Sequence, residues 1–270
     1  MSVVKHALQA RWLGYFALAV VFAIITSLFG LWQWERRTEA VAEIDRVESN
    51  FDQEPVAWNA LMGPSSAWSD DLRWRSVVIE GEYRSESTTL VRTRPRIGQV
   101  GFEILVPFAT VDGEVIMVNR GWVPTGANED EPDLIPPAPI GPVTVVGKLF
   151  PGEPEIPGRS APSGQVATIH LPTVARETGL VIDQRAYLAL VSETPPVSPT
   201  PLLIDRPVAD EGPHLSYTFQ WFLLGILGFI AWGYLLREDY RGESGNSKKR
   251  ARVSDQDEED ALLDQWEQTH

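Results

Sequence analysis

The chain has 270 residues, a formal net charge of −14 from 23 basic and 37 acidic side chains, and no cysteine. The absence of cysteine excludes disulfides, thiolate metal centres, a cysteine nucleophile, covalent haem attachment and a thiolate copper shuttle. The acidic balance argues against nucleic acid as a partner, because phosphate binding depends on lysine and arginine.

Two apolar segments, 12–34 and 212–236, carry no Asp, Glu, Lys or Arg and are predicted to be transmembrane helices. The first has 23 residues, which at about 1.5 Å per residue is long enough to cross a hydrocarbon layer of about 30 Å. Aromatic residues lie near both ends of each segment, as expected at the level of the lipid headgroups. The alternative is a pair of buried core helices, which the length disfavours.

The first segment is expected to be an uncleaved anchor. It ends in LWQWERR, where a signal peptide would need small residues for cleavage. Only eleven residues precede it, fewer than a transit peptide needs, which favours a bacterial plasma membrane over a mitochondrion.

The placement of basic residues predicts the orientation. Six follow the second span within 237–270, whereas Arg206 is the only one in the twenty residues before it. Because Lys and Arg favour the cytoplasmic side, both ends are predicted to be cytoplasmic. The predicted regions are a cytoplasmic N-terminus (1–11), a first span (12–34), an extracytoplasmic domain (35–211), a second span (212–236) and a disordered cytoplasmic tail (237–270). The extracytoplasmic domain has 15 basic and 27 acidic residues, a net charge of −12.

The predicted extracytoplasmic domain is rich in strand patterns. Alternating or continuous apolar runs predict strands at 72–83, 87–94, 101–122, 143–150, 164–171 and 186–192. Asp112-Gly113 marks a hairpin turn within the third run. Helices are predicted at 38–49, continuing the first span, and at 173–178. The predicted fold is therefore two transmembrane α-helices flanking a β-rich (α+β) domain with an antiparallel, partly closed sheet.

No catalytic motif is evident, so an enzyme is not expected. The sequence contains no HExxH, GxSxG, phosphate-binding or dinucleotide-binding pattern. Its four histidines are His6, His170, His214 and His270, too far apart in sequence to suggest a copper site. A membrane-anchored hydrolase would require His170, predicted in a strand, to be hydrogen-bonded to Ser or Thr in an open pocket.

The start of the second span carries the clearest candidate site. Pro213 suits the first helical position, which puts His214 in the first turn. At helical spacing His214 shares a face with Tyr217, Trp221 and two glycines, with Gln220 adjacent. A neutral imidazole there can bind a metal, and the flat side chains suit a haem. The other interpretation is an aromatic belt at the membrane interface and nothing more.

Two further segments carry candidate residues. Gln33 lies near the outer end of the first span, with Arg36 and Arg37 just beyond it. These arginines are expected either to pair with haem propionates or to anchor the helix at lipid phosphates. In the segment VNRGWVP (118–124), Arg120 is expected to be a buried ion-pair or sheet-capping residue, with a contact to a partner as the alternative.

Six segments stand out in order along the chain: FGLWQWERR, VIEGEY, GFEILVPF, VNRGWVP, VTVVGKLFPGE and HLSYTFQWF. Together they resemble the signature segments of the SURF1 (Shy1-like) family. Members of that family are membrane proteins that assist assembly of haem–copper cytochrome c oxidase. The resemblance covers residues 12–236, suggests a bacterial member, and gives no role to residues from 243 onward.

The resemblance implies maturation of the catalytic oxidase subunit, with haem a as a transiently bound cofactor. The family's histidine corresponds to His214, the expected metal ligand, with Tyr217, Gln220 and Trp221 in the same motif. The other motifs match at Gly30, Trp32, Gln33 and Arg36, and at Asn119, Arg120, Gly121 and Trp122. Two functions stay open: delivery of haem a, with haem a synthase as a further partner, or a scaffold that stabilises an oxidase intermediate without haem.

Overall fold

A computed structural model of the chain describes residues 3–127 and 131–267, with side chains as far as Gly242. It divides into two compact units, one made of residues 1–41 and 210–270 and the other of residues 42–209. Each unit is described by itself.

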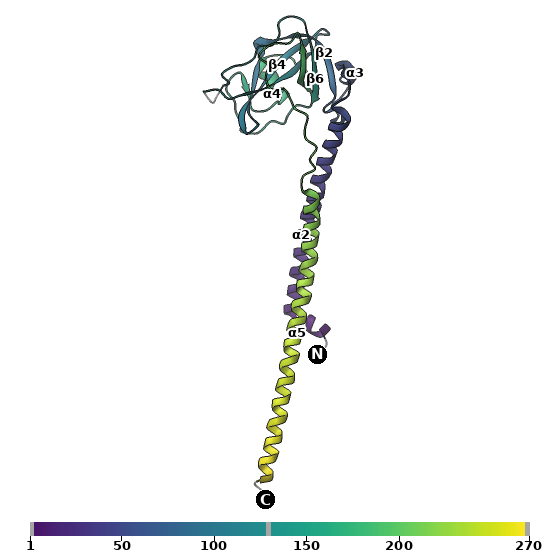
Figure 1. The fold of residues 1–270 in the computed structure, drawn as a ribbon, viewed down its shortest axis with the longest axis vertical. Coiled ribbons are helices and arrows are strands. Elements are labelled where there is room, and N and C mark those ends of the chain that lie inside the picture. Colours follow the sequence, from purple (N-terminus) through teal and green to yellow (C-terminus); the bar gives the residue numbers. More distant parts are fainter. Residues whose placement is uncertain (1–2, 128–130, 268–270) are drawn as a thin grey trace. The chain divides into compact units, whose positions relative to one another are not determined.

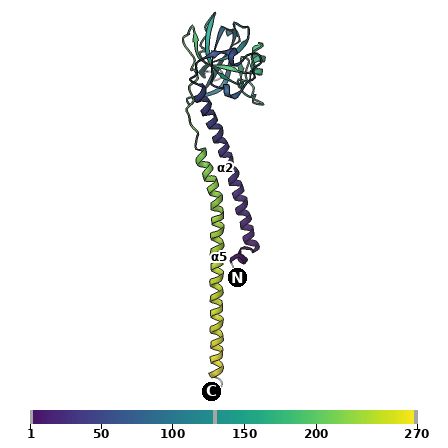
Figure 2. The same cartoon turned by 90° about the vertical axis from the view of Figure 1, so that its right-hand side faces the viewer.

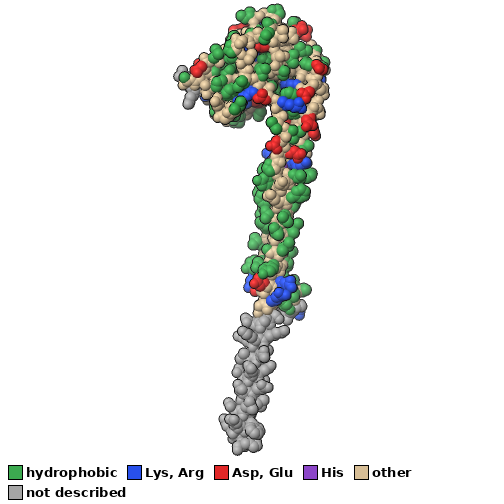
Figure 3. Space-filling view, in the orientation of Figure 1, with side chains coloured by type: hydrophobic (Ala, Val, Ile, Leu, Met, Phe, Trp, Pro, Cys, Tyr) green, Lys and Arg blue, Asp and Glu red, His purple; other side chains and the backbone are tan. Residues whose placement is uncertain are grey.

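The first unit is helical and contains α1 (Val3–Ala7), most of α2 (Ala10–Asn50) and α5 (His214–Glu267). Helices α2 and α5 lie side by side (Figures 1 and 2). Both are long and apolar enough to cross a membrane, and in their most apolar windows 17% and 11% of the residues are buried. A core helix would be largely buried, so the exposed apolar side chains disfavour the core-helix alternative. Figure 3 shows these side chains, with charged residues gathered at both ends of the apolar stretch.

Glycines set the contact between the two helices. A Cβ added to Gly30 would lie 3.1 Å from the ring of Phe222, and one added to Gly228 would lie 3.0 Å from Phe22. Because these positions lack a side chain, a large ring from the opposite helix packs directly on the backbone. The two glycines therefore allow a close approach of the two helices.

Helix α5 extends beyond the predicted span. Its backbone is helical as far as Glu267, which differs from the disordered tail predicted for 237–270. The physical reason is in the sequence, because 214–267 contains no proline and is rich in strong helix formers. The C-terminal residues 268–270, including His270, lie outside the described residues.

The second unit is built around a closed barrel of five strands. They are β2 (Ser76–Tyr83), β4 (Gln99–Thr110), β5 (Val115–Pro124), β6 (Val143–Phe150) and β8 (Tyr187–Thr194). Strand β2 pairs with both β6 and β4, and this second pairing completes the ring β2-β6-β8-β5-β4. The pairs are antiparallel except β5–β8, which is parallel. The predicted antiparallel sheet is thus confirmed in the main, but it closes fully.

Three further strands extend the sheet, and two of them, β1 and β7, have only two residues each. Strand β3 (Thr89–Arg96) pairs with β4 and with β7 (Gln165–Val166), and β1 (Val56–Ala57) pairs with β2. The strand predicted at 164–171 is reduced to β7, because α4 (Leu171–Thr178) begins around Pro172. The strand predicted at 72–83 starts only at β2, after the short helix η1 (Asp70–Leu72) and Trp74, whose φ of 70° interrupts an extended strand.

Two apolar clusters fill this unit. The larger lies inside the barrel and includes Phe102, Phe108 and Ile116, and the smaller packs α4 against β3, β4 and β5 through Val91, Leu105 and Val174. Strand β4 contributes to both clusters because its successive side chains point to opposite faces. This explains why its sequence is nearly continuously apolar.

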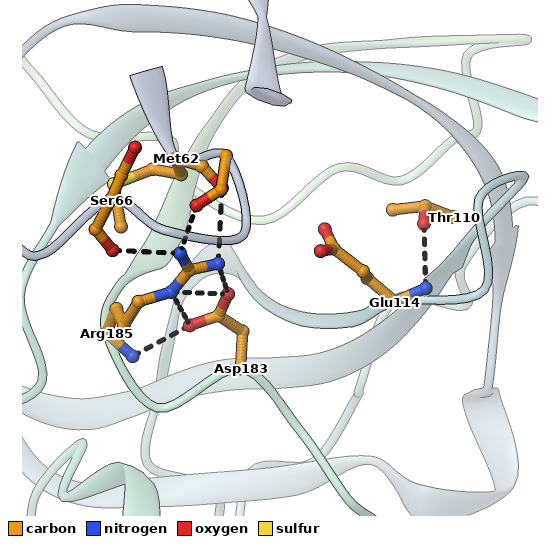
Figure 4. A network of polar contacts seen from close by, with 7 residues as sticks. Met62, Ser66, Thr110, Glu114, Asp183 and Arg185 are labelled. Atoms are coloured by element: carbon orange, nitrogen blue, oxygen red, sulfur yellow. Dashed lines mark hydrogen bonds and ion pairs between the residues drawn. The ribbon is translucent and has the colours of Figure 1, made fainter. Parts of the chain in front are cut away.

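Arg185 anchors the segment after α3 (Trp58–Leu61) to the start of β8. Its guanidinium donates to the backbone carbonyls of Met62, Gly63 and Ser66 and pairs with Asp183 (Figure 4). The short helix η2 (Ser85–Ser87) links β2 to β3.

Barrel closure gives a first prediction. A Cβ at Gly81 would lie 2.0 Å from the carbonyl oxygen of Ala109, so Gly81→Ala is expected to separate β2 from β4 and cost about 3 kcal/mol. Gly152→Ala is the matched control, since its nearest atoms belong to the flexible side chain of Leu171 at 3.1 Å. Denaturant unfolding of the full chain in detergent, followed by near-ultraviolet circular dichroism, measures both. Equal stability of the two variants would contradict the closure.

Candidate functional site

The predicted residues His214 and Gln33 meet although they are 181 positions apart in the sequence. His214 is the first residue of α5, and its Nδ1 lies 2.8 Å from Oε1 of Gln33 on α2. Both side chains are half-buried. With Nδ1–H assigned as donor to the amide oxygen, the lone pair of a neutral imidazole is on Nε2. Metal-binding histidines commonly use this arrangement, in which the second ring nitrogen fixes the tautomer and the ring orientation.

A glycine keeps space beside the free nitrogen. Gly212 has φ +67°, and a Cβ built there would lie 3.2 Å from Nε2 of His214. A side chain at this position would be strained and would crowd the nitrogen. The turn before α5 therefore leaves room next to Nε2.

Charged residues lie at this end of the helix pair. Arg37 forms an ion pair with Glu211 at 2.9 Å, and Arg36 forms one with Glu39 on its own helix at 2.9 Å. The Arg36 guanidinium is 5.9 Å from the ring centre of Trp32 and its side chain is 54% exposed. An exposed pair of this kind contributes little to stability, so Arg36 can exchange its partner for another carboxylate at small cost.

The predicted helical face divides into two parts. Trp221 stacks on Phe29 of α2 with ring centres 4.8 Å apart, whereas Tyr217 is 44% exposed and Gln220 is exposed. At about 100° per residue, Tyr217 and Gln220 lie about 60° and 120° around α5 from His214, beyond the line of contact with α2. Sequence spacing alone could not locate that line.

A haem fits on the exposed side of the pair but not between the helices. The contact face is filled by side chains of α2, as the Phe29–Trp221 stack shows. The outward surface offers an imidazole nitrogen and the exposed rings of Trp32 and Tyr217, 48% and 44% exposed. The described residues contain no cluster of three or more His, Cys, Asp or Glu side chains that could hold a metal ion.

Arg120 of the VNRGW segment forms a buried network inside the barrel domain. Its side chain is 0% exposed and donates to Glu193 at 2.6 Å and to the carbonyl of Pro136 at 2.9 Å. The Tyr83 hydroxyl donates to the same carboxylate at 2.9 Å. Burial, together with Glu193, raises the pKa of Tyr83. The prediction of a buried ion pair is confirmed.

The neighbouring motif residues hold a segment that follows β8. Asn119 accepts a hydrogen bond from the Gly121 amide at 3.0 Å, and Gly121 has φ +128° with the Leu202 carbonyl close against it. Trp122 exchanges two backbone hydrogen bonds with Leu202, both 2.9 Å long, and its indole donates to the carbonyl of Arg94. Asn119, Gly121 and Trp122 therefore have a structural role, which is to hold the segment around Leu202 against β5.

A cleft of about 360 Å³ beside this motif was not predicted. Arg94 lies between Glu103, at 3.1 Å, and Glu153, at 2.6 Å. Burial raises the pKa of Glu103 even though Arg94 opposes this shift. Burial by itself would lower the pKa of Arg94, but Glu103 and Glu153 outweigh it and raise that pKa. The only signal for this cleft in the sequence is the alternation of Arg92, Arg94 and Arg96 along β3.

His170, the histidine considered for a hydrolase, lies at the N-terminal end of α4. His170 precedes α4, and its Nδ1 lies 2.8 Å from Oγ1 of Thr173, which also accepts from Arg176 at 2.9 Å. His170 is therefore not in a strand, because the chain turns into α4 there. The hydrogen bond to a threonine is present, but the cleft beside the VNRGW segment is lined by other residues.

Comparisons with a family model and with curated proteins identify relatives of the chain. The family model described as the SURF1 family matches residues 20–226. An uncharacterized SURF1-like protein of Mycobacterium tuberculosis is 30% identical, over 84% of this chain and 85% of its own length. A SURF1-like protein of Rickettsia conorii is 22% identical over 78% and 86%, and the Surfeit locus protein 1 of Arabidopsis thaliana is 25% identical over 74% and 71%.

The buried network gives a second prediction. Arg120→Met leaves Glu193 buried without its charge partner and is expected to cost about 3–5 kcal/mol of unfolding free energy. Adding Glu193→Gln removes the unpaired charge and is expected to restore part of that loss. The same detergent unfolding experiment measures single and double variants. A double variant less stable than Arg120→Met would contradict the ion pair.

Proposed function

The chain belongs to the SURF1 family, a family of assembly factors, and from this we propose that it assists assembly of haem–copper cytochrome c oxidase by holding haem a at His214. The proposed client is the catalytic oxidase subunit, and haem a synthase is the proposed donor. In this role the protein binds and positions its cargo and performs no chemical step on it.

The observation that carries the proposal is the hydrogen bond between His214 and Gln33. It joins two helices and presents Nε2 in the unprotonated tautomer that binds iron. An interfacial aromatic belt would need neither this pairing nor the open position at Gly212. Family membership and this geometry both support His214 as the haem ligand.

Each neighbouring residue has a proposed task. Gln33 orients the imidazole, and the exposed rings of Trp32 and Tyr217 offer flat apolar surface to the macrocycle. Arg36 exchanges Glu39 for a propionate, which a guanidinium can bind through two parallel hydrogen bonds. When bound, haem a supplies the redox-active iron that the client requires.

The proposed location is the plasma membrane, with α2 and α5 as the two spans. Basic residues after the second span support cytoplasmic termini, and the central domain is then extracytoplasmic. Its net charge of −12, from 15 basic and 27 acidic residues, would then face the client on the outer side.

A second function is a scaffold that stabilises an oxidase intermediate without haem. The filled contact face between α2 and α5 favours it, because a haem must lie on the surface of the helix pair instead of in a closed pocket. The structural use of Asn119 and Trp122 agrees with a rigid docking domain. The absorption spectrum of the purified protein separates the two functions.

The third prediction concerns haem. Protein purified from cells that make haem a is expected to show a haem spectrum, which His214→Ala abolishes by removing the iron ligand. Gln33→Leu is expected to lower haem occupancy by about tenfold, since loss of an outer partner typically weakens a site by 10–100-fold. His170→Ala, a change in the barrel domain, is the matched control and keeps the spectrum. A haem-free wild-type preparation, or an unchanged His214→Ala spectrum, would leave the scaffold as the function.

The fourth prediction concerns topology. A reporter that works only in the cytoplasm is expected to be active when fused after Arg252, because the basic residues following the second span hold that end inside. The comparison is the same fusion to a reporter that works only outside, which is expected to be silent. The reverse pattern would overturn the predicted cytoplasmic C-terminus.

A further inference from the structure

An apolar groove runs along the helix pair at the end where Trp12 lies. Its volume is about 360 Å³. Its lining residues are Trp12, Tyr15, Leu18, Ala19 and Phe22 from α2 and Gly228, Ala231, Trp232 and Leu235 from α5. The small side chains of Ala19 and Ala231 leave the space, and aromatic rings lie beside it. The part of α2 that lines it, from Trp12 to Phe22, is about 15 Å long at about 1.5 Å per residue.

A second hollow of about 380 Å³ adjoins the groove. It shares Trp12, Tyr15 and Leu235 with the groove and adds Arg11, Glu238 and Asp239. The two together form one site that is apolar along its length and charged at one end. We call the charged end the mouth.

The charges of the mouth are arranged in a defined way. Asp239 is already engaged, because it pairs with Arg11, lies 3.0 Å from Nε2 of His6 and accepts from the Trp12 indole at 3.2 Å. The Arg11 side chain is nevertheless 54% exposed and retains donors for a second anion. Glu238 is exposed and forms no ion pair within the described part of the chain. The mouth thus offers one cationic and one anionic group to a ligand.

We propose that this site binds one phosphatidylethanolamine molecule. Its phosphate lies at Arg11, its ammonium donates to Glu238, and one acyl chain occupies the groove. A purely anionic headgroup is disfavoured because it would bring a further negative charge near Glu238 and give that carboxylate no cationic partner. A choline headgroup lacks the N–H donors that an ethanolamine ammonium gives to a carboxylate.

The mouth also argues against a partner helix as occupant. An apolar helix lying in the groove would bring apolar side chains against Arg11 and Glu238, whose charges would lose solvent without gaining a partner. A phospholipid instead matches both parts of the site, because its acyl chain suits the apolar groove and its headgroup suits the charged mouth. The inference rests on the proposed membrane position of α2 and α5 and is independent of haem.

The test is native mass spectrometry of the full chain with phosphatidylethanolamine, phosphatidylglycerol or phosphatidylcholine added in turn. One retained phosphatidylethanolamine is expected, held about tenfold more tightly than the other two lipids, a difference typical of one good charged contact. Ala231→Phe fills the groove and is expected to reduce retention by about tenfold or more. Ala17→Phe is the matched control, because Ala17 is exposed on α2 and does not line the groove.

Two mouth variants test the headgroup. Glu238→Gln is expected to remove the preference for ethanolamine over glycerol headgroups. Arg11→Gln is expected to weaken the binding of all three lipids. Equal retention of the three lipids by the wild type, or full retention by Ala231→Phe, would overturn the proposal, as would a copurifying membrane protein that Ala231→Phe alone releases. If the reporter fusion fails but the lipid selectivity is as expected, the lipid site stands and only the proposed orientation of the two helices in the membrane is wrong.

Discussion

The close approach of α2 and α5 is the constraint on which the helical unit depends. In the membrane position proposed for them, two apolar helices gain little from the hydrophobic effect, so their association would rely on packing and hydrogen bonds. Gly30 and Gly228 let rings of the opposite helix sit on the backbone, and Phe29 stacks on Trp221. With the helices this close, the amide of Gln33 reaches the imidazole of His214.

The same close packing explains how one helix pair can carry two different sites. Near His214 the contact face is filled, so a ligand must use the outer surface. At the other end the small residues Ala19 and Ala231 leave part of the face open, and a groove forms. The size of a few side chains therefore separates the proposed haem position from the proposed lipid position.

The barrel domain depends on a different interaction, a buried charge network held by closure of the sheet. Arg120 and Glu193 come from β5 and β8, whose direct pairing is limited to Val118–Leu188 and Asn119–Ala189. Where these strands diverge, Trp122 pairs with Leu202 instead. An ion pair of this kind adds specificity more than stability, because removing its charges from water is costly.

Much of this organisation was predictable from the sequence, because the periodicity of apolar residues and the local composition can be read from each segment alone. Charge-free stretches of membrane length identified α2 and α5, and Asp112-Gly113 identified the turn between β4 and β5. Strand pairing is not local, so closure of β2 onto β4 and the cleft at Glu103 were not predictable. A buried ion pair was one of the roles predicted for Arg120, but its partner Glu193 was not predicted.

The sequence by itself determined the two apolar helices and the β-rich domain between them, and it identified His214 and the VNRGW segment as candidates. The tertiary structure alone decided which side of α5 meets α2, since helical spacing defines a face but not what covers it. It therefore separated Trp221, packed on Phe29, from the exposed Tyr217 and Gln220. It also joined His214 to Gln33, because only folding brings distant side chains within hydrogen-bond distance.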